Sequence, residues 1–330
     1  MRVLVVCTGN SCRSALAEAL WRHHWDGDCE VRSAGSAPTG QVHPLVPEVL
    51  RERGIDASGL VSEPLSRFEG ESFDLVVTVC DEARESCQAP SGGVRTLHWP
   101  FPDPAVFTEG ASPEDALQVF RSARDTIEGR ILRFRDSLVG ARGFGARLRQ
   151  IHAQLPAPPP DDRSLAFLSL VEAIEGGIVS EHSVWEQLPA WILERYAPFG
   201  WGWNGIYRLR GLPPNRRLEL AAAAGPPVCA TIDERPGGFG VSGMCFDAIH
   251  AGHPLVAADV KSWPGYVSCD GESGLGTVAG IAVPIAPSRA PIAVWDLDST
   301  APLDPSDGIL FGALWALLPS VVPVPKEWLR

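Results

Sequence analysis

The chain has 330 residues, of which 45% are apolar and 21% charged, so it holds enough material for two packed domains. Its 40 acidic and 28 basic side chains give a net charge of −12, which argues against general binding to nucleic acid or to an anionic membrane. No apolar run reaches the roughly 18 residues that span a bilayer, and the N-terminal run is too short for a signal peptide. We therefore expect a cytoplasmic protein whose eight cysteines are reduced, and hence catalytic, redox-active or metal-binding rather than structural cross-links.

The first 138 residues alternate short β-rich runs with helical stretches. Strands are expected at 2–6 and 73–79, a turn at 33–35, and helices at 14–25, 46–53 and 113–138. Strands separated by helices favour a parallel sheet with helices on both faces. Residues 1–140 are therefore assigned to an α/β domain.

The composition changes after this domain. Three prolines and two aspartates near residue 160 predict a semi-rigid linker, which we place at 141–163. Residues 164–330 are expected to form an α+β domain with helices flanking an antiparallel sheet. Its helices are expected at 165–178, 184–196 and 309–318, and its strands at 205–209, 218–222, 278–285 and 292–297.

The first chemical motif lies between the first strand and the first helix: Cys7-Thr8-Gly9-Asn10-Ser11-Cys12-Arg13-Ser14. Gly9 allows the backbone to turn N–H groups inward, and the helix that follows adds its positive end. Arg13 supplies a planar pair of donors for a tetrahedral oxyanion, and Cys7 is expected to face these donors as a thiolate. The motif predicts an anion-binding loop with a nucleophilic cysteine.

This loop resembles the phosphate-binding loop of the low-molecular-weight protein tyrosine phosphatase superfamily, which includes the thioredoxin-coupled arsenate reductases. The resemblance covers roughly residues 1–138. It implies that Cys7 is the nucleophile, that residues 8–14 bind the oxyanion, and that Asp103, in the stretch 98–105, is the general acid.

Two further cysteines separate a reductase from a phosphatase. Cys80 ends the second buried strand and Cys87 follows in a polar stretch, and a phosphatase needs neither thiol. The reductase resemblance implies that Cys7 attacks arsenate, Cys80 then forms a disulfide with Cys7 as arsenite leaves, and Cys87 moves the disulfide outward for thioredoxin. No other cofactor is expected. Cys12 is a spare thiol of the loop, and Cys29 is expected to be a semi-buried cysteine without a role.

The second half contains Cys229, Cys245 and Cys269, without a C-x-x-C pair or a nearby histidine, so no metal is expected. This region, roughly 164–330, resembles a GAF domain of the free methionine-(R)-sulfoxide reductase type. The resemblance rests on the segment 203–207, the three cysteine contexts, the stretch 259–265 and the segment 296–299.

That resemblance implies roles for individual residues. Cys269 would attack the sulfoxide sulfur and Cys229 would resolve the sulfenic acid, with Cys245 as an auxiliary thiol. The substrate pocket would be formed by two carboxylates and two aromatic rings, namely Asp296, Asp298, Trp203 and Tyr207.

The second half also departs from its family. Gly280 stands where the family has a glutamate, and the stretch between Cys269 and Pro284 is longer and rich in glycine; Glu272 is a candidate replacement. The leading hypothesis is a thioredoxin-dependent arsenate reductase fused to a methionine sulfoxide reductase-like domain. A phosphatase whose GAF domain senses a ligand is the alternative.

Overall fold

The computed structural model describes residues 1–25, 29–81, 95–108, 110–179, 183–213, 215–267, 274–288 and 290–329. It divides into two compact units, residues 1–136 and 137–330. The division falls four residues before the expected end of the first domain, at 140. No helix of the described part is long and apolar enough to cross a membrane.

The first unit is built on a four-stranded parallel sheet in the order β2-β1-β3-β4. Its strands are β1 (Arg2–Cys7), β2 (Glu30–Gly35), β3 (Leu75–Thr78) and β4 (Arg95–His98), and its helices are α1 (Arg13–His24), α2 (Leu45–Arg51) and the start of α4 (Pro113–Ala153). The expected parallel sheet is confirmed. The turn expected at 33–35 is wrong, because these residues pair with β1 as part of β2 and are buried.

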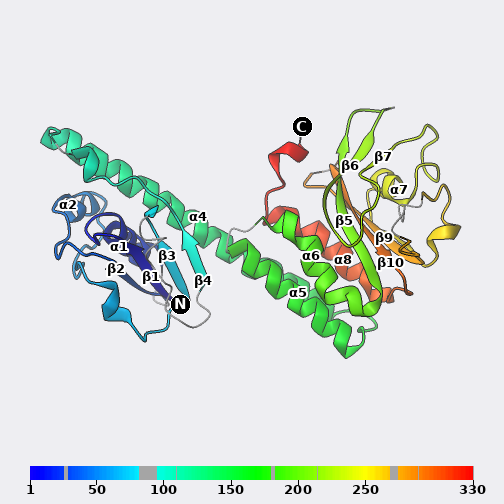
Figure 1. Cartoon of the computed structure of the whole chain (residues 1–330), viewed down its shortest axis with the longest axis horizontal. Coiled ribbons are helices and arrows are strands. Elements are labelled where there is room, and N and C mark those ends of the chain that lie inside the picture. Colours follow the sequence, from blue (N-terminus) through cyan, green and yellow to red (C-terminus); the bar gives the residue numbers. More distant parts are fainter. Residues whose placement is uncertain are drawn as a thin grey trace. The chain divides into compact units, whose positions relative to one another are not determined.

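The helix α4 is longer than the sequence pattern predicts, since it continues past 138 to Ala153 (Figure 1). The expected linker, 141–163, therefore contains the end of α4 and the start of α5, and only 154–160 is non-helical. Gly140, Gly143 and Gly145 weaken a helix but do not end it, so composition alone placed the linker too early.

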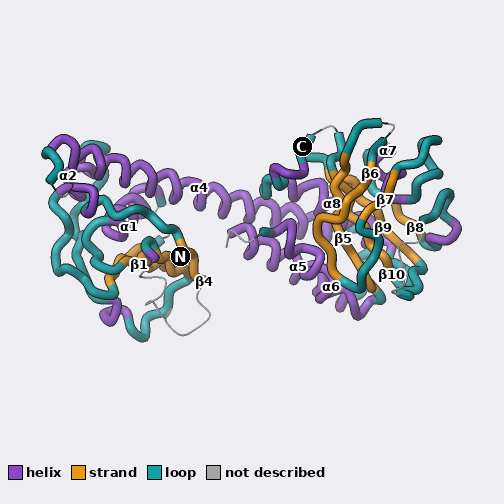
Figure 2. The backbone as a smooth tube through the Cα atoms, turned by 45° about the horizontal axis from the view of Figure 1, so that its top comes forward, coloured by secondary structure: helices purple, strands orange, loops and turns teal. Residues whose placement is uncertain are grey.

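The second unit contains a six-stranded antiparallel sheet in the order β7-β6-β5-β10-β9-β8 (Figure 2). The helices α6 (Val184–Tyr196) and α8 (Pro305–Leu317) pack against the sheet, and α5 (Asp161–Val179) packs against α6. The helix α7 (Met244–Ala251) packs against β9 and β10. The strands are β5 (Trp201–Arg210), β6 (Arg217–Ala224), β7 (Thr231–Asp233), β8 (Leu255–Ala257), β9 (Ala279–Ile285) and β10 (Ala293–Ser299). The expected α+β architecture is confirmed. The elements α7, β7 and β8 were not expected, because their sequences show no clear helical or strand periodicity.

The core of the second unit explains why β5 and β10 are central. Both strands are buried along most of their length, although each carries polar residues such as Asn204 in β5 and Asp296 in β10. On one face Trp201 and Trp295 pack with aromatic residues of α6 and α8. On the other face Trp203 and Tyr207 pack against α7, in a cluster that includes Cys245 and Phe246. The second candidate site lies beside this second cluster.

Candidate functional site

The first candidate site is the loop between β1 and α1. Cys7 ends β1 and is buried, with its Sγ 3.0 Å from Ser14 Oγ and accepting the backbone N–H of Asn10 at 3.1 Å. The left-handed turn that aims this N–H lies at Asn10, with φ of 45°, and not at Gly9 as the sequence predicts. Asparagine tolerates this conformation better than other side chains do, and here its side chain is also held by hydrogen bonds.

A buried polar network supports the loop from behind. Asn10 Nδ2 donates to Ser14 Oγ at 2.8 Å and to Ser33 Oγ at 2.9 Å, and its Oδ1 accepts the N–H of Glu63 at 2.7 Å. Ser33 in turn donates to Glu18 at 2.6 Å; burial raises the pKa of that carboxyl, against the lowering effect of the Ser33 bond. The motif identifies Asn10 and Ser14, whereas Ser33 and Glu18 could not be found because neither lies in a local pattern.

Two other contributors to the loop were also missed. A Cβ on Gly35 would lie 2.6 Å from the carbonyl oxygen of Thr8, so the end of β2 must be a glycine for the loop to approach it. His43 donates its backbone N–H to the carbonyl of Ser11, and its ring stacks on Phe120 with 4.5 Å between centroids. Burial lowers the pKa of His43, with Asp103 acting in the opposite direction.

Arg13 joins the anion-binding loop to the loop that carries the expected general acid. Its two terminal nitrogens donate to Asp103 Oδ2 at 2.5 Å and to the carbonyl of Phe101 at 3.1 Å. The Arg13 side chain is 11% exposed and that of Asp103 34%, so the pair is sheltered but open to a small solute. The anion-binding loop thus carries a guanidinium in contact with a carboxyl group, the pairing required of a binding residue and a proton donor.

The sheet brings Cys80 to the same edge as Cys7. Because Val6 pairs with Thr78 in the parallel register of β1 and β3, the chain reaches Cys80 just beyond the level of Cys7. The Cys80 thiol is buried and lies 3.4 Å from Thr8 Oγ1, in the loop itself. Cys87 lies outside the described residues. Cys12 is also buried in the loop, and burial raises its pKa to about 11, which keeps it a neutral thiol near neutral pH.

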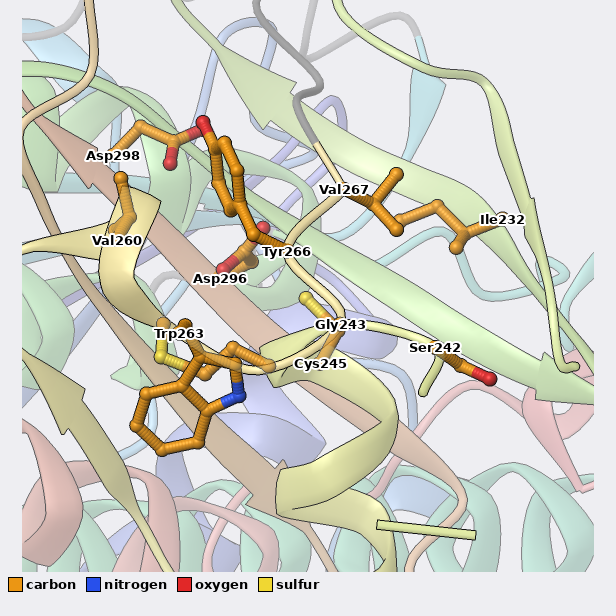
Figure 3. Close-up of a pocket in the computed structure, with 11 residues that line it drawn as sticks. Ile232, Ser242, Gly243, Cys245, Val260, Trp263, Tyr266, Val267, Asp296 and Asp298 are labelled. Carbon is orange, nitrogen blue, oxygen red and sulfur yellow. The ribbon is translucent and has the colours of Figure 1, made fainter. Parts of the chain in front are cut away.

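The second candidate site is a pocket between α7, β10 and the stretch 260–267, shown in Figure 3. It has an empty volume of about 500 Å³, including its opening to solvent. Three of the expected residues line it: Cys245 at the start of α7, and Asp296 and Asp298 on β10. Trp263 and Tyr266 supply aromatic rings that the sequence reasoning did not assign to the site.

Asp296 is a buried acid of this pocket whose pKa is raised. It is buried on β10, where it pairs with Gly205 of β5 and Ala282 of β9. Burial raises the pKa of Asp296 to about 6, although the Cys245 thiol and the N–H of Leu297 donate to the carboxylate and oppose the rise. A carboxyl group with this pKa can hold a proton close to neutral pH, as a general acid must.

The other expected residues of the second site lie apart from the pocket lining. Trp203 and Tyr207 are fully buried in the core cluster, and Tyr207 donates its hydroxyl to the carbonyl of Cys229 at 2.9 Å. Cys269 lies outside the described residues. At Gly280 a Cβ would meet the carbonyl of Leu297 at 2.9 Å and Met244 Cε at 3.2 Å, so the position has no room for a longer side chain.

The described residues contain no group of three or more histidine, cysteine or acidic side chains that could hold a metal ion. In the first unit, a buried cysteine follows the first strand of a parallel sheet, its sulfur accepts a loop N–H, and an arginine lies in the same loop. These features define a cysteine-based oxyanion-binding domain.

Comparison with known proteins agrees with this class. Residues 2–140 match the family model described as low molecular weight phosphotyrosine protein phosphatase. The arsenate reductase of Shouchella clausii is 36% identical over 135 residues, which are 41% of this chain and 95% of that protein. Through its first unit, the chain belongs to the low molecular weight phosphotyrosine protein phosphatase family.

Solved structures are similar to each half of the chain separately. A structure of an arsenate reductase in the phosphate binding state is 30% identical and covers 40% of this chain and 94% of its own, with a TM-score of 0.32. The free methionine-R-sulfoxide reductase of Neisseria meningitidis, in complex with its substrate, is 25% identical and covers 52% of this chain and 97% of its own, with a TM-score of 0.42.

Proposed function

We propose that the first unit reduces arsenate to arsenite through Cys7, Cys80 and Cys87, and that thioredoxin regenerates it. The observation that carries this proposal is the position of Cys80, a buried thiol 3.4 Å from Thr8 Oγ1 in the loop that holds Cys7. A phosphatase cycle uses only the nucleophile, the arginine and the acid, so it gives no reason for a thiol at this place. Relatives named arsenate reductase support the same choice.

The steps follow from two-electron thiol chemistry. The Cys7 thiolate attacks arsenic and displaces an oxygen that leaves as water, with Asp103 as proton donor and Arg13 holding the remaining oxygens. The Cys80 thiolate then attacks Cys7 sulfur; the electron pair of the sulfur–arsenic bond passes to arsenic, which leaves as arsenite. Cys87 attacks Cys80, which frees Cys7, and the dithiol of thioredoxin reduces the Cys80–Cys87 disulfide.

A coupled assay tests the relay, with thioredoxin, its NADPH-dependent reductase and arsenate as substrate. Cys80→Ser and Cys87→Ser should each abolish steady-state arsenate turnover, while Cys29→Ser, a thiol outside the relay, should keep it. In Cys80→Ser, hydrolysis of an aryl phosphate should persist, because Cys7, Arg13 and Asp103 remain. Arsenate turnover that survives the loss of Cys80 would refute the relay.

The alternative function is phosphate monoester hydrolysis. It is supported by the contact between Arg13 and Asp103, the two groups that a phosphatase would need besides its nucleophile. The wild-type chain decides between the two: turnover of an aryl phosphate much faster than that of arsenate would favour the phosphatase.

For the second unit we propose reduction of free methionine-(R)-sulfoxide. Cys269 would attack the sulfoxide sulfur and take its oxygen as a sulfenic acid while methionine leaves, and Cys229 would then form a disulfide with Cys269 and release water. Thioredoxin would reduce that disulfide. The pocket supports this proposal through Asp296, a buried carboxyl that can protonate the departing oxygen, and through Asp298 beside it.

The competing function for this unit is sensing of a small ligand. A coupled assay with free methionine-(R)-sulfoxide separates the two. Cys269→Ser should abolish turnover and Cys12→Ser, in the other unit, should not. Loss of turnover in Cys269→Ser supports catalysis, whereas a wild-type chain that binds the sulfoxide without reducing it leaves sensing as the function of the unit.

A further inference from the structure

A buried carboxylate connects the two loops that form the rim of the second pocket. Asp247, in the first turn of α7, is fully buried, and its Oδ2 accepts the indole N–H of Trp263 at 2.7 Å. Its Oδ1 accepts the backbone N–H of Gly240 at 2.7 Å. One oxygen thus holds the stretch 260–267 and the other holds the loop 237–243.

The two loops are also in direct contact with each other. Gly265 has a positive φ of 66°, and a Cβ there would lie 2.5 Å from the carbonyl oxygen of Gly240. The exposed ring of Phe239 lies 6.2 Å from that of Trp263, centroid to centroid. Close backbone approach and an aromatic contact make one continuous rim from two separate segments, and Asp247 lies beneath both.

Both loops contribute to the pocket itself. Ser242 and Gly243 line it from the first loop, and Trp263, Tyr266 and Val267 line it from the second (Figure 3). The same pocket contains the carboxylates of Asp296 and Asp298. An aromatic face near carboxylates favours a ligand that carries a positive charge, because the ring and the anions both attract a cation.

We infer that Asp247 is a positioning residue that fixes Trp263 as the aromatic wall of this pocket, and so sets its affinity for a ligand with a positively charged amino group. This inference rests on the proposed function of the second unit, in which the ligand is the amino-acid sulfoxide. Asp247 is not among the residues that line the pocket. It acts through Trp263, and without its two bonds only the close approach of Gly265 to Gly240 and the contact with the Phe239 ring would hold the indole against the 237–243 loop.

A double-mutant cycle on the full chain tests the inference with free methionine-(R)-sulfoxide as the probe. In Asp247→Asn the amide can still accept one hydrogen bond but turns a donor toward the other N–H, so KM should rise roughly tenfold with kcat nearly unchanged. In the Trp263→Phe background, which lacks the indole N–H, the same change should raise KM less than about threefold. Equal increases in both backgrounds would show that Asp247 is merely structural and would overturn the inference. Asp233→Asn, an exposed aspartate of the same unit paired with Arg217, is the matched control and should leave KM unchanged.

A second measurement does not depend on turnover. Cys245 is 7% exposed and lines the pocket next to the wall, so loosening Trp263 should expose its thiol. Alkylation of reduced protein by iodoacetamide, followed at the Cys245 peptide by mass spectrometry, should be roughly tenfold faster in Asp247→Asn and unchanged in Asp233→Asn. If the wild-type chain reduces no sulfoxide, the proposed function fails, and the alkylation rate alone decides the inference. An unchanged rate in Asp247→Asn would overturn it.

Discussion

The two thiol sites of this chain are built in different ways. In the first unit the nucleophile, the arginine and the N–H donor lie within residues 7–14, and a single strand–loop–helix segment places them. In the second unit the pocket takes residues from α7, β10 and two loops, spread from 232 to 298. A site of the first kind depends on the shape of one loop, whereas a site of the second kind depends on how distant segments are held together.

The largest effect is expected from a change that deforms the loop of the first site without removing any chemical group. In Gly35→Ala the new methyl group would lie 2.6 Å from the Thr8 carbonyl oxygen, a backbone atom that cannot move freely. We expect a loss of about 4 kcal/mol in the free energy of unfolding, at the upper end for a single substitution, and no detectable arsenate turnover. Urea unfolding and the coupled assay measure the two effects. Gly143→Ala, at a glycine of α4 with open space around it and no positive φ, is the control for an added methyl group alone.

The next effect separates the conformation of Asn10 from its hydrogen bonds. Asn10→Gly keeps the left-handed conformation and loses three side-chain bonds, whereas Asn10→Ala loses the bonds and also strains the backbone. We expect about 3 kcal/mol of destabilisation for glycine, since buried partners lose their bonds, and about 1 kcal/mol more for alanine. Unfolding of both variants in urea measures the difference. Equal stabilities would mean that the left-handed turn carries no strain.

The first site also shows how much of its structure the sequence could predict. The motif predicted the loop, its nucleophile and its arginine, because a local pattern of residue types encodes them, whereas Asp103 was implied only by the family resemblance. It could not identify Gly35 or Ser33, which matter only because β2 pairs with β1 and brings them behind the loop. Tertiary contacts of this kind leave no periodic signal along the chain.

In the second unit the sequence was a poorer guide for the same reason. The aspartates of β10 line the pocket, but Trp203 and Tyr207 belong to the buried core, and the aromatic rings of the pocket are those of Trp263 and Tyr266. All four are aromatic residues close to the expected motif segments. Only the packing of α7 on β9 and β10 decides which rings are covered and which line the opening.

A pH dependence distinguishes the buried acid of the second site. Burial raises the pKa of Asp296 to about 6, above that of an unfolded aspartate, so its protonated form favours the folded state. This contribution is fully present below about pH 4 and is lost as the pH rises through 6. Relative to Asp296→Asn, the wild type should therefore lose about 2 to 3 kcal/mol of stability between pH 4 and pH 7.

Urea unfolding of both proteins over this pH range measures the difference. The same group should affect catalysis, since sulfoxide reduction that uses protonated Asp296 as its acid falls above pH 6 and loses this limb in Asp296→Asn. If the free energy of unfolding changed equally with pH in the wild type and in Asp296→Asn, Asp296 would not titrate in this range.

The smallest effect concerns α8, which packs against the sheet of the second unit. Asp304 caps α8: its side chain accepts the N–H of Ser306 at 2.9 Å, and its own N–H donates to Asp307 at 3.1 Å, in a reciprocal capping box. Asp304→Ala should cost about 1 kcal/mol, the usual value of an N-cap, and Asp304→Asn, which keeps the acceptor, should cost less. Neither change should alter KM for the sulfoxide, because α8 does not line the pocket. A raised KM in either variant would mean that the pocket depends on the whole sheet and not only on the loops joined by Asp247, so this small change tests how local the second site is.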